Sequence, residues 1–491
     1  MIGMPRPESA LRTIDGAGLS GVRRLPLPVM SGERPIDVAE RFADLPGLVL
    51  LESARPGRTG RFSYLSADPV AVLDEPAPGA DTFATARALL RSLSAGPLDG
   101  GPPFAGGLVG YLAYDLGRRL ERLPAIAEAD QDLPVLRLAL HDWVVAWDRR
   151  TGEAWLVGRA VDGDREGLDR RLDAVLARLG GPAAATSAIG TEPPSAMATT
   201  TPESEALVFR SGLDRAAFVD GVEAIRDAIA AGELYQANLA RRLETPFEGS
   251  PWPLYRRLRT GDPALFSAYL DLGAAPGGGG GPRAILSASP EPFLTASADG
   301  RVATNPIKGT RPRGRTRDAD RALARELLAS AKDRAENVMI VDVLRNDLGR
   351  VARPGSVRVP RLCRLERTAA VQHLVSTVTA RLAPGRDPFD LLRAAFPGGS
   401  VTGAPKIRAM ELIEGLEPVR RGPYTGAIGW IGPDGAMSMS IAIRTLVADG
   451  RRLTLHVGGG ITWRSDPAEE WDETVAKARG PLSAIGGSEA S

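Results

Sequence analysis

The chain has 491 residues, of which 43% are hydrophobic and 25% charged, a balance typical of a globular enzyme rather than of a disordered or collagenous chain. Its 61 Lys and Arg residues are matched by 60 Asp and Glu residues, so a net charge of +1 gives no overall field that would hold nucleic acid or an anionic membrane. The single cysteine, Cys363, excludes an internal disulfide and a cysteine-based zinc site, and we expect a cytoplasmic protein.

The first residues of the chain show no apolar leader. No stretch anywhere reaches the ~18 unbroken apolar residues of a membrane span. The length exceeds the ~250–300 residues that one core usually covers, so we expect two domains or one large composite.

Three regions follow one another along the chain. Residues 1–180 are predicted to form an α+β unit, with two strands around a turn at 148–152 and a helix over 165–180. Residues 181–205 are rich in Pro, Ala, Ser and Thr, which predicts a linker. Residues 206–488 open with an amphipathic helix and then alternate strand and helix patterns, which predicts a second mixed unit.

Five consecutive glycines at 277–281 lie between two strand-like runs. A phosphate-binding loop would need a Lys and a Ser or Thr at fixed offsets and a following helix, whereas Pro282 and a strand-like run follow here. We therefore interpret these glycines as a flexible hairpin loop.

The segment NPIKGTRPRG at 305–314 places one lysine among prolines, glycines and two arginines. Most lysines in surface loops are simply solvated. An amine that lies near Arg311 and Arg313 and is partly shielded from water would instead lose its proton more easily and become a nucleophile. Lys308 is therefore a candidate covalent catalyst.

Two pairs of acidic residues occur at helical spacing. Asp333 with Glu336, and Glu470 with Glu473, are each three positions apart, so each pair lies on one helix face. Two facing helices would then offer carboxylate oxygens to a hard cation, for which Mg²⁺ is the natural occupant. A solvated acidic face is the alternative, and the apolar run after Glu336 argues against it at that position.

A third group could bind an organic dianion. It comprises Arg444, the glycines Gly458, Gly459 and Gly460, and Lys477. Glycine lets backbone N–H groups approach a carboxylate, and arginine binds one through two parallel hydrogen bonds. A β-bulge at the glycines and a structural ion pair at Arg444 are equally compatible with the sequence.

Nine motifs follow one another between residues 287 and 474. In order they are SASPEPF, NPIKGTRPRG, KDRAENVMIVDVLRNDLGRV, VQHLVSTV, FPGGSVTGAPK, YTGAIGW, AIRT, GGGI and SDPAEEWDET. This series closely resembles the chorismate-utilising enzyme family, and LLESARPGRTGRFSYL and PFAGGLVGYLAYDLGR extend the resemblance into the N-terminal region. The resemblance implies an α+β fold built as a multi-layered α/β/β/α sandwich of antiparallel sheets, with residues 206–488 as the chorismate-binding domain.

Within that family, the lysine of the KGT motif resembles the aminodeoxychorismate synthases, because anthranilate synthases usually have alanine at the position of Lys308. The resemblance implies amination of chorismate at C4 to 4-amino-4-deoxychorismate, on the route to p-aminobenzoate and folate. Ammonia would come from a separate glutamine amidotransferase subunit, because Cys363 lacks the context of a catalytic cysteine. The alternatives are an anthranilate synthase large subunit, a non-catalytic relative, and an isochorismate or salicylate synthase.

The resemblance also implies roles for single residues. Lys308 would add to C2 of chorismate as the 4-hydroxyl leaves, Glu291 would be the general acid/base, and His373 matches an active-site histidine. Positions that match magnesium ligands are Glu336, Glu470 and Glu473, with Asp333 as a ligand or a neighbour of one. Positions that match substrate-binding residues are Thr402, Tyr424, Arg444, Gly458, Gly459, Gly460 and Lys477.

Two further segments resemble the region where relatives hold tryptophan, either as a feedback inhibitor or as a buried ligand. They contribute Glu52 and Ser53 from LLES, and Tyr235, Gln236 and Asn238 from GELYQANL. A sheet core with satisfied polar groups is the alternative interpretation of both segments.

Overall fold

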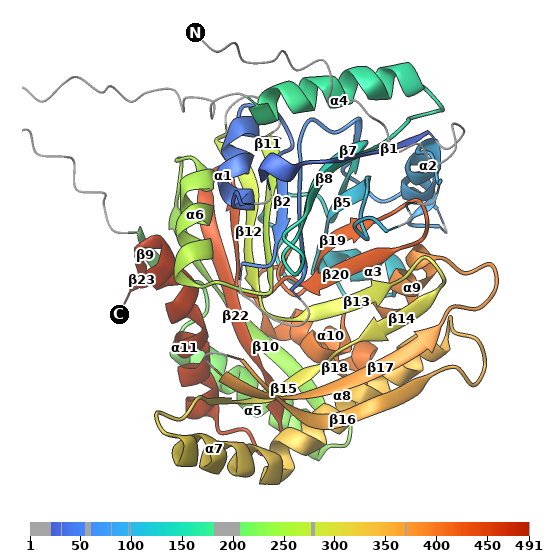
Figure 1. Ribbon diagram of the computed structural model, residues 1–491. Helices are drawn as coiled ribbons and strands as arrows, with labels where there is room; N and C mark the ends of the chain where they lie inside the picture. The colour runs from blue at the N-terminus through green and yellow to red at the C-terminus, as the bar shows by residue number, and fades with distance from the viewer. Residues whose placement is uncertain are drawn as a thin grey trace, which may run out of the picture.

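The structure is a computed structural model that describes residues 21–30, 32–54, 60–79, 81–96, 98, 100–180, 207–275, 280–368 and 371–490. Its two large β-sheets lie face to face, with helices on the outer side of each (Figure 1). The predicted linker at 181–205 and the glycines at 277–279 fall outside the described residues.

The first sheet has 13 strands within the described part of the chain, and its neighbours are antiparallel except for the last pair. In spatial order the strands are β1 (Val22–Pro26), β8 (Ala154–Arg159), β7 (Trp143–Asp148), β3 (Phe62–Ser66), β2 (Val49–Glu52), β11 (Phe266–Ala274), β12 (Pro282–Ser289), β21 (Thr445–Asp449), β22 (Arg452–Thr462), β10 (Gln236–Pro246), β9 (Leu207–Ser211) and β23 (Gly487–Glu489), with β18 (Gly403–Ala404) also on β10.

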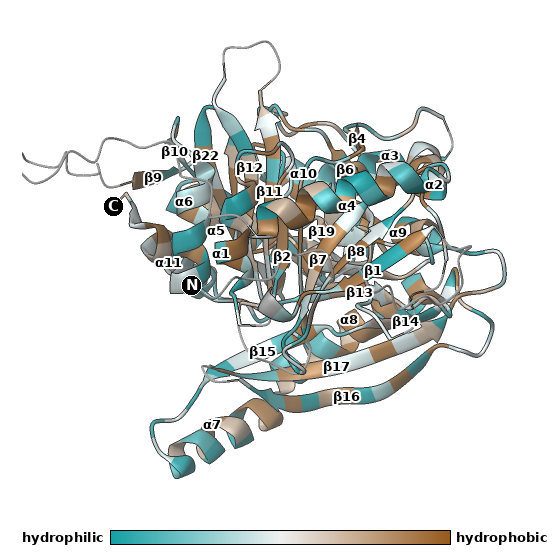
Figure 2. Cartoon of the chain, turned by 45° about the horizontal axis from the view of Figure 1, so that its top comes forward, coloured by the Kyte–Doolittle hydropathy of each residue, from teal (hydrophilic) through white to brown (hydrophobic). Residues whose placement is uncertain are grey.

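The second sheet has 10 strands within the same residues, and all of its pairs are antiparallel. Its order is β15 (Ile307–Pro312), β17 (Val371–Arg381), β14 (Arg301–Thr304), β13 (Pro292–Ala296), β20 (Met437–Ile441), β19 (Ala427–Ile431), β5 (Gly107–Leu112), β6 (Leu136–His141) and β4 (Ala71–Leu73), with β16 (Arg358–Arg367) paired to β17. In Figure 2 the strands β16 and β17 are striped teal and brown, as expected where one strand face packs on a helix and the other meets water.

Helices cover the outer faces of both sheets. Those on the first sheet are α1 (Pro35–Ala39), α4 (Arg165–Gly180), α5 (Arg215–Ala230), α6 (Pro251–Gly261) and α11 (Pro467–Ile485). Those on the second sheet include α2 (Ala84–Ser92), α7 (Arg317–Ala329) and α8 (Ala331–Gly349). The remaining helices are α3 (Gly117–Leu120), α9 (Pro388–Ala395) and α10 (Lys406–Leu416).

The core consists of layers that follow from the two-residue period of the strands. On β2, Leu50 packs with Ile36 of α1 on the outer side of the sheet. The preceding residue, Val49, packs in the cluster between the sheets, together with Val109 of β5. Because each sheet buries both faces in this way, the layers are α/β/β/α, and the predicted α+β sandwich of antiparallel sheets is confirmed.

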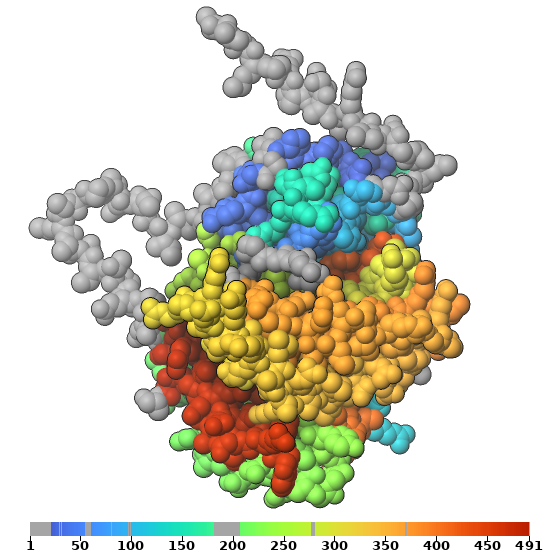
Figure 3. Space-filling view, turned by 60° about the horizontal axis from the view of Figure 1, so that its bottom comes forward, coloured from blue at the N-terminus to red at the C-terminus, as the bar shows by residue number. Residues whose placement is uncertain are grey.

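Both sheets take strands from both sides of the predicted linker. In the first sheet β2 pairs with β11, and in the second sheet β5 pairs with β19. The boundaries proposed at 180 and 206 therefore do not separate two sheets, and the core is a single composite. Figure 3 shows that, within the part of the chain that follows the linker, the yellow-to-orange segment lies directly against the red C-terminal segment.

Several local predictions agree with the observed elements. The turn at 148–152 joins the antiparallel strands β7 and β8, and α4 spans the residues predicted to be helical. Helix α5 begins after Asp214, whose carboxylate accepts the N–H of Ala217 as an N-cap. The described ends of the glycine-rich loop join β11 and β12, which pair antiparallel as a hairpin requires.

Candidate active site

The KGT motif lies on β15 at the point where that strand touches α8. The pairing of β15 with β17 shifts between Lys308 and Thr310, and Gly309 has a φ of +71°. A Cβ atom at residue 309 would lie 2.8 Å from Cβ of Asp333. The glycine is therefore needed both for the left-handed backbone and for the close approach of strand and helix.

Lys308 is half-buried beside this bulge. Its Nζ donates a hydrogen bond to the carbonyl oxygen of Ser400, at 3.3 Å, in the short 3-10 helix Gly399–Val401. Burial raises the pKa of the carboxyl groups of Glu291 and Glu336, and the nearby charge of Lys308 offsets part of that rise. The lysine is thus surrounded by the acids that the sequence analysis assigned to catalysis and to metal binding.

The physical reason given for a reactive Lys308 was wrong. Arg311 and Arg313 were expected to act on the amine, but their guanidinium groups pair with acids of α7 and α8. The partners are Glu326 and Asp333 for Arg311, and Asp320 for Arg313. Each of the two arginines is therefore engaged by carboxylates of these helices.

Glu291 lies at the start of β13, where its backbone carbonyl accepts the N–H of Ile441. Burial raises the pKa of its carboxyl group above the usual value, while Lys308 and a hydrogen bond with Ser400 oppose that rise. A carboxyl group that keeps its proton at higher pH beside a cationic amine is suited to act as a general acid.

Three glutamates from two helices face one region. The helices α8 and α11 approach each other at Lys332, whose Nζ lies 3.9 Å from the carboxylate of Glu470. Burial raises the pKa of Glu336 and of Glu470, and the neighbouring acids Asp333 and Glu473 raise them further. For Glu473, burial alone would raise the pKa, but the charge of Lys477, 2.6 Å away, outweighs it and the pKa is lowered.

These carboxylates do not form a closed cage. Among the described residues, no three His, Cys, Asp or Glu side chains are close enough together to enclose a metal ion. Asp333 is turned toward Arg311, at 3.5 Å, whereas Oε1 of Glu336 is buried without a hydrogen-bond partner. Because an orphaned buried carboxylate oxygen is costly, Glu336 with Glu470 and Glu473 is chemically suited to a hard cation.

The glycine run of β22 forms the surface between these groups. A Cβ at residue 459 would lie 3.1 Å from Oε2 of Glu470 and 3.8 Å from Nζ of Lys477. A Cβ at residue 460 would collide with the Gln236 amide and lie 3.6 Å from Nζ of Lys308. Lys477 also donates to the carbonyl of Gly458, at 2.8 Å. Lys308, Glu470 and Lys477 therefore all lie close to the glycine backbone of β22.

Gln236 belongs to this site rather than to a group with Glu52 and Ser53. It pairs with Thr462 at the end of β22, and both polar atoms of its amide are buried without a partner. Asn238 pairs with Gly460, and its Oδ1 likewise has no partner. The pairing of β10 with β22 joins segments more than 200 residues apart, so a single sequence carried no signal for this neighbourhood.

The histidine predicted to be catalytic and the other residues predicted to bind substrate lie at varied positions. His373 faces Thr310, two residues from Lys308, through a 2.9 Å contact between Nδ1 and Oγ1. Thr402 is fully buried, and its hydroxyl donates to the carbonyl of Gly398. Tyr424 is buried in the turn before β19, and Arg444 is exposed with a φ of +50°. No described contact joins these last three side chains to Lys308.

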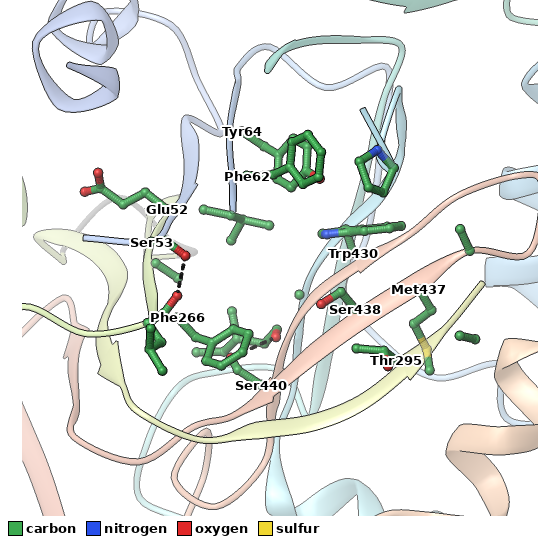
Figure 4. A pocket seen from close by; sticks show the side chains of 18 of the residues that line it. Glu52, Ser53, Phe62, Tyr64, Phe266, Thr295, Trp430, Met437, Ser438 and Ser440 are labelled. Carbon is green, nitrogen blue, oxygen red and sulfur yellow. Dashed lines mark hydrogen bonds between the residues drawn. The ribbon is translucent and has the colours of Figure 1, made fainter. Parts of the chain in front are cut away.

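A separate pocket of about 420 Å³ lies between the two sheets and is lined by Glu52 and Ser53. Figure 4 shows Phe62, Tyr64 and Trp430 around it, and the hydroxyl of Ser53 bonded to the carbonyl of Leu265. The carboxylate of Glu52 is turned away toward Arg259 and Tyr255, which donate hydrogen bonds to it. The lining contains none of Tyr235, Gln236 and Asn238, and Tyr235 is 72% exposed. The five residues predicted for tryptophan are thus divided between two places.

Comparison with known proteins identifies the family. A profile described as chorismate binding enzyme matches residues 49–483. The chain belongs to the chorismate binding enzyme family. It is 42% identical over 449 residues to anthranilate synthase component 1 of Streptomyces coelicolor, which covers 90% of this chain and 84% of that protein. It is 40% identical over 461 residues to aminodeoxychorismate synthase component 1 of Salmonella typhimurium, with coverages of 90% and 94%.

Solved structures agree with this chorismate binding enzyme assignment. Anthranilate synthase component I from Streptococcus pneumoniae is similar with a TM-score of 0.74 and 30% identity, covering 87% of this chain and 93% of that chain. The protein is therefore a chorismate-utilising enzyme with the α+β fold of that neighbour. In the described residues, no helix has both the length and the apolar character needed to cross a membrane.

Proposed function

We propose that this protein is an aminodeoxychorismate synthase component that converts chorismate and ammonia into 4-amino-4-deoxychorismate in the cytoplasm, on the route to p-aminobenzoate and folate. The observation that carries the proposal is the position of Lys308. Its amine lies beside the carboxyl group of Glu291 and 3.6 Å from the point where a side chain at residue 460 would begin. An amine in that position can form a bond to a ligand resting on the glycine run.

The proposed reaction has two substitutions. In the first, the amine of Lys308 forms a bond to C2 of chorismate, both ring double bonds shift by one position, and the C4–O bond breaks. Glu291 gives its proton to the departing hydroxyl, which leaves as water, and the resulting carboxylate takes the proton that the lysine nitrogen gives up. In the second, ammonia bonds to C4, both double bonds shift back, and the C2–N bond to Lys308 breaks. Glu291 returns a proton to the departing lysine nitrogen and takes one from the new ammonium group at C4.

We propose Mg²⁺ as the cofactor, held by Glu336, Glu470 and Glu473. The partnerless oxygen of Glu336 and the raised pKa values of Glu336 and Glu470 support a cation site at this position. When bound, Mg²⁺ would offset the charge of the substrate's ring carboxylate and hold it in place. Gly459, Gly460 and Lys477 border the same region, and we propose that they contact the substrate, with Thr402, Tyr424, Arg444 and Gly458 completing its surroundings.

Ammonia is proposed to come from a glutamine amidotransferase subunit. Cys363 is buried, and its thiol lies near the backbone carbonyl of Arg334 and the amide of Asn337, without a histidine. It is therefore unsuited to glutamine hydrolysis. The relatives named as component 1 of a synthase support a two-component assembly.

Anthranilate synthesis is the second candidate, favoured by the 42% identity to the Streptomyces coelicolor anthranilate synthase component. That reaction would place ammonia on C2 and eliminate pyruvate, so the lysine would have no covalent role.

A bound tryptophan is proposed for the pocket beside Ser53, which has room for an aromatic ring. Mass spectrometry of the denatured purified protein would reveal free tryptophan released from this pocket. If the protein is purified in added tryptophan and still releases none, the proposal of a bound tryptophan is contradicted.

The deciding experiment supplies purified protein with chorismate, Mg²⁺ and an ammonium salt, without glutamine, and identifies the products by mass. We expect aminodeoxychorismate from the wild type and none from Lys308→Ala or from Lys308→Arg, which keeps the charge but removes the nucleophile. The chain has four lysines, so an adduct of chorismate less water, formed without ammonia, can be assigned to Lys308 by peptide mapping. Anthranilate and pyruvate as products, or full activity of Lys308→Arg, would overturn the proposal.

A further inference from the structure

The ring of His456 lies flat against the ring of Tyr424. The ring centroids are 5.1 Å apart and the planes differ by 12°. His456 belongs to β22, on the strand that carries the glycine run, whereas Tyr424 lies in the turn that leads from α10 into β19. The stack therefore connects the first sheet to an element of the second.

Ordinary core packing does not account for a histidine at this position. The side chain is 4% exposed, and its Nε2 is buried without a hydrogen-bond partner. It lies across from Arg242 in the strand register and borders a cavity of about 90 Å³ with Arg242 and Glu417. A leucine would avoid the cost of the unpaired nitrogen, so the flat ring itself is the property that this position uses.

The histidine is also kept uncharged. Burial lowers the pKa of His456 well below its usual value, and the charges of Arg242, Arg421 and Arg452 lower it further, with only Asp130 opposing. A neutral imidazole can lie parallel to a phenol ring without drawing an anion or water into the sheet interface.

Tyr424 has a second fixed neighbour. The guanidinium of Arg421 lies 5.8 Å from the ring centroid of Tyr424. That guanidinium is itself held by Glu417 and by the backbone carbonyls of Val401 and Asn238, which belong to the segments next to Thr402 and Gln236. With one neighbour anchored in this way, the stack on His456 fixes the remaining freedom of the phenol plane.

We propose that His456 is a positioning residue, which holds the Tyr424 phenol in the orientation that chorismate requires. The proposal rests on the substrate contact proposed above for Tyr424. His456 itself touches no reacting atom, so its effect passes through the tyrosine. An aromatic replacement should therefore serve as well as histidine, and a non-aromatic one should not.

The test compares His456→Phe, which keeps a flat ring, with His456→Leu and His456→Gln, which remove it. We expect KM for chorismate to rise roughly two- to tenfold in the ring-less variants, with kcat less affected, and to stay near the wild-type value in His456→Phe. Each variant is also made in a Tyr424→Phe background, which lacks the phenol hydroxyl. In that background, loss of the ring at residue 456 should raise KM for chorismate no further. Dissociation constants for chorismate measured without ammonia provide a readout independent of turnover.

Equal increases of KM in both backgrounds would overturn the proposal, as would a His456→Phe variant that is folded and as impaired as His456→Leu. Thermal unfolding of each variant separates loss of fold from loss of position, and His456→Gln replaces His456→Leu if the latter does not fold. Failure of the proposed function has a different signature. In that case the wild type forms no aminodeoxychorismate, while the binding measurements on the variants can still be interpreted.

Discussion

Two buried regions of the molecule contain charged groups, and they differ in whether those groups have hydrogen-bond partners within the protein. Below the turn before β19, Glu417 accepts two hydrogen bonds from Arg421 and a third from the backbone N–H of Ala240. Around Lys308, by contrast, Glu336 keeps an oxygen without a partner, and the Gln236 amide has none at either atom. The Glu417–Arg421 pair is satisfied by groups of the protein, whereas polar atoms of Glu336 and Gln236 remain available to a ligand.

This difference separates groups that stabilise the fold from groups that serve a ligand. An unpaired buried polar group costs free energy, and a bound molecule that pairs with it would recover that cost. Neutral substitutions around Lys308 should therefore lower activity and leave stability unchanged or higher. Neutral substitutions at the Glu417–Arg421 pair should do the reverse, and each prediction below tests one side of this contrast.

The largest effect is expected at Glu291. Replacing it with glutamine removes the proton donor, so kcat should fall by about 10²- to 10⁴-fold, the usual contribution of general acid catalysis. The melting temperature should not fall, because a neutral amide is easier to bury than the carboxylate whose pKa is already raised. Rates of chorismate consumption and thermal unfolding measure both quantities. The matched control is Asp299→Asn, in the exposed turn between β13 and β14. Wild-type turnover in Glu291→Gln would show that Glu291 is not the general acid.

Breaking the interior ion pair should have the opposite outcome. Glu417→Gln leaves the guanidinium of Arg421 buried beside a neutral amide, which should reduce the free energy of unfolding by about 3–5 kcal/mol. The fraction that stays folded should turn over chorismate within a fewfold of the wild type. Urea or thermal unfolding measures the loss, with Glu411→Gln on the exposed side of α10 as control. A stable but inactive Glu417→Gln would assign the pair to the active site and remove the contrast.

Glu336 tests the same contrast through the proposed metal. Glu336→Gln should weaken Mg²⁺ binding and lower activity at limiting Mg²⁺ by about 10- to 100-fold. Its stability without metal should rise, because the variant no longer buries a carboxylate oxygen that lacks a partner. Titration of activity with Mg²⁺ and a calorimetric binding isotherm measure the effect. Asp342→Asn changes an exposed acid of the same helix and should match the wild type in activity and in Mg²⁺ binding. An unchanged Mg²⁺ requirement in Glu336→Gln would exclude Glu336 as a metal ligand.

The sequence was most informative where the structure depends on neighbours along the chain. Helix α4 spans 165–180 as its apolar spacing predicted, and Asp333 with Glu336 indeed shares a helix. These features depend on propensity and spacing, which a single sequence contains.

The sequence was least informative where distant segments meet. Gln236 was grouped with Glu52 because both resembled one region of relatives, whereas the pairing of β10 with β22 brings Gln236 to Gly460. Arg311 was expected to act on Lys308, but α7 folds back and supplies Glu326 as its partner. Side-chain charge depends on such partners, which spacing along the chain does not specify.

The smallest effect concerns a buried histidine outside the site. The hydroxyl of Ser66 donates to the carbonyl of Trp143, so Nδ1–H of His141 donates to Ser66 and its Nε2 is left without a partner. Burial lowers the pKa of His141 to about 3, helped by the charge of Arg171. Below pH ~6.5 the unfolded chain therefore binds a proton that the folded chain excludes, and the stability present above that pH is lost as pH falls toward 3 at about 1.4 kcal/mol per unit.

His141→Leu should remove this contribution. Between pH 6 and pH 4 its free energy of unfolding should fall less steeply than that of the wild type, by up to about 1.4 kcal/mol per pH unit, whatever the difference at neutral pH. The buried carboxyl groups with raised pKa values act in the opposite sense, since they take up protons in the folded state first, but they are common to both proteins and cancel in the comparison. Unfolding curves at four or five pH values measure the two slopes. If the free energies of unfolding of the wild type and of His141→Leu fall equally steeply with pH, His141 takes up a proton in the folded protein. The surroundings of His141 would then be as open to a ligand or to water as those of Lys308.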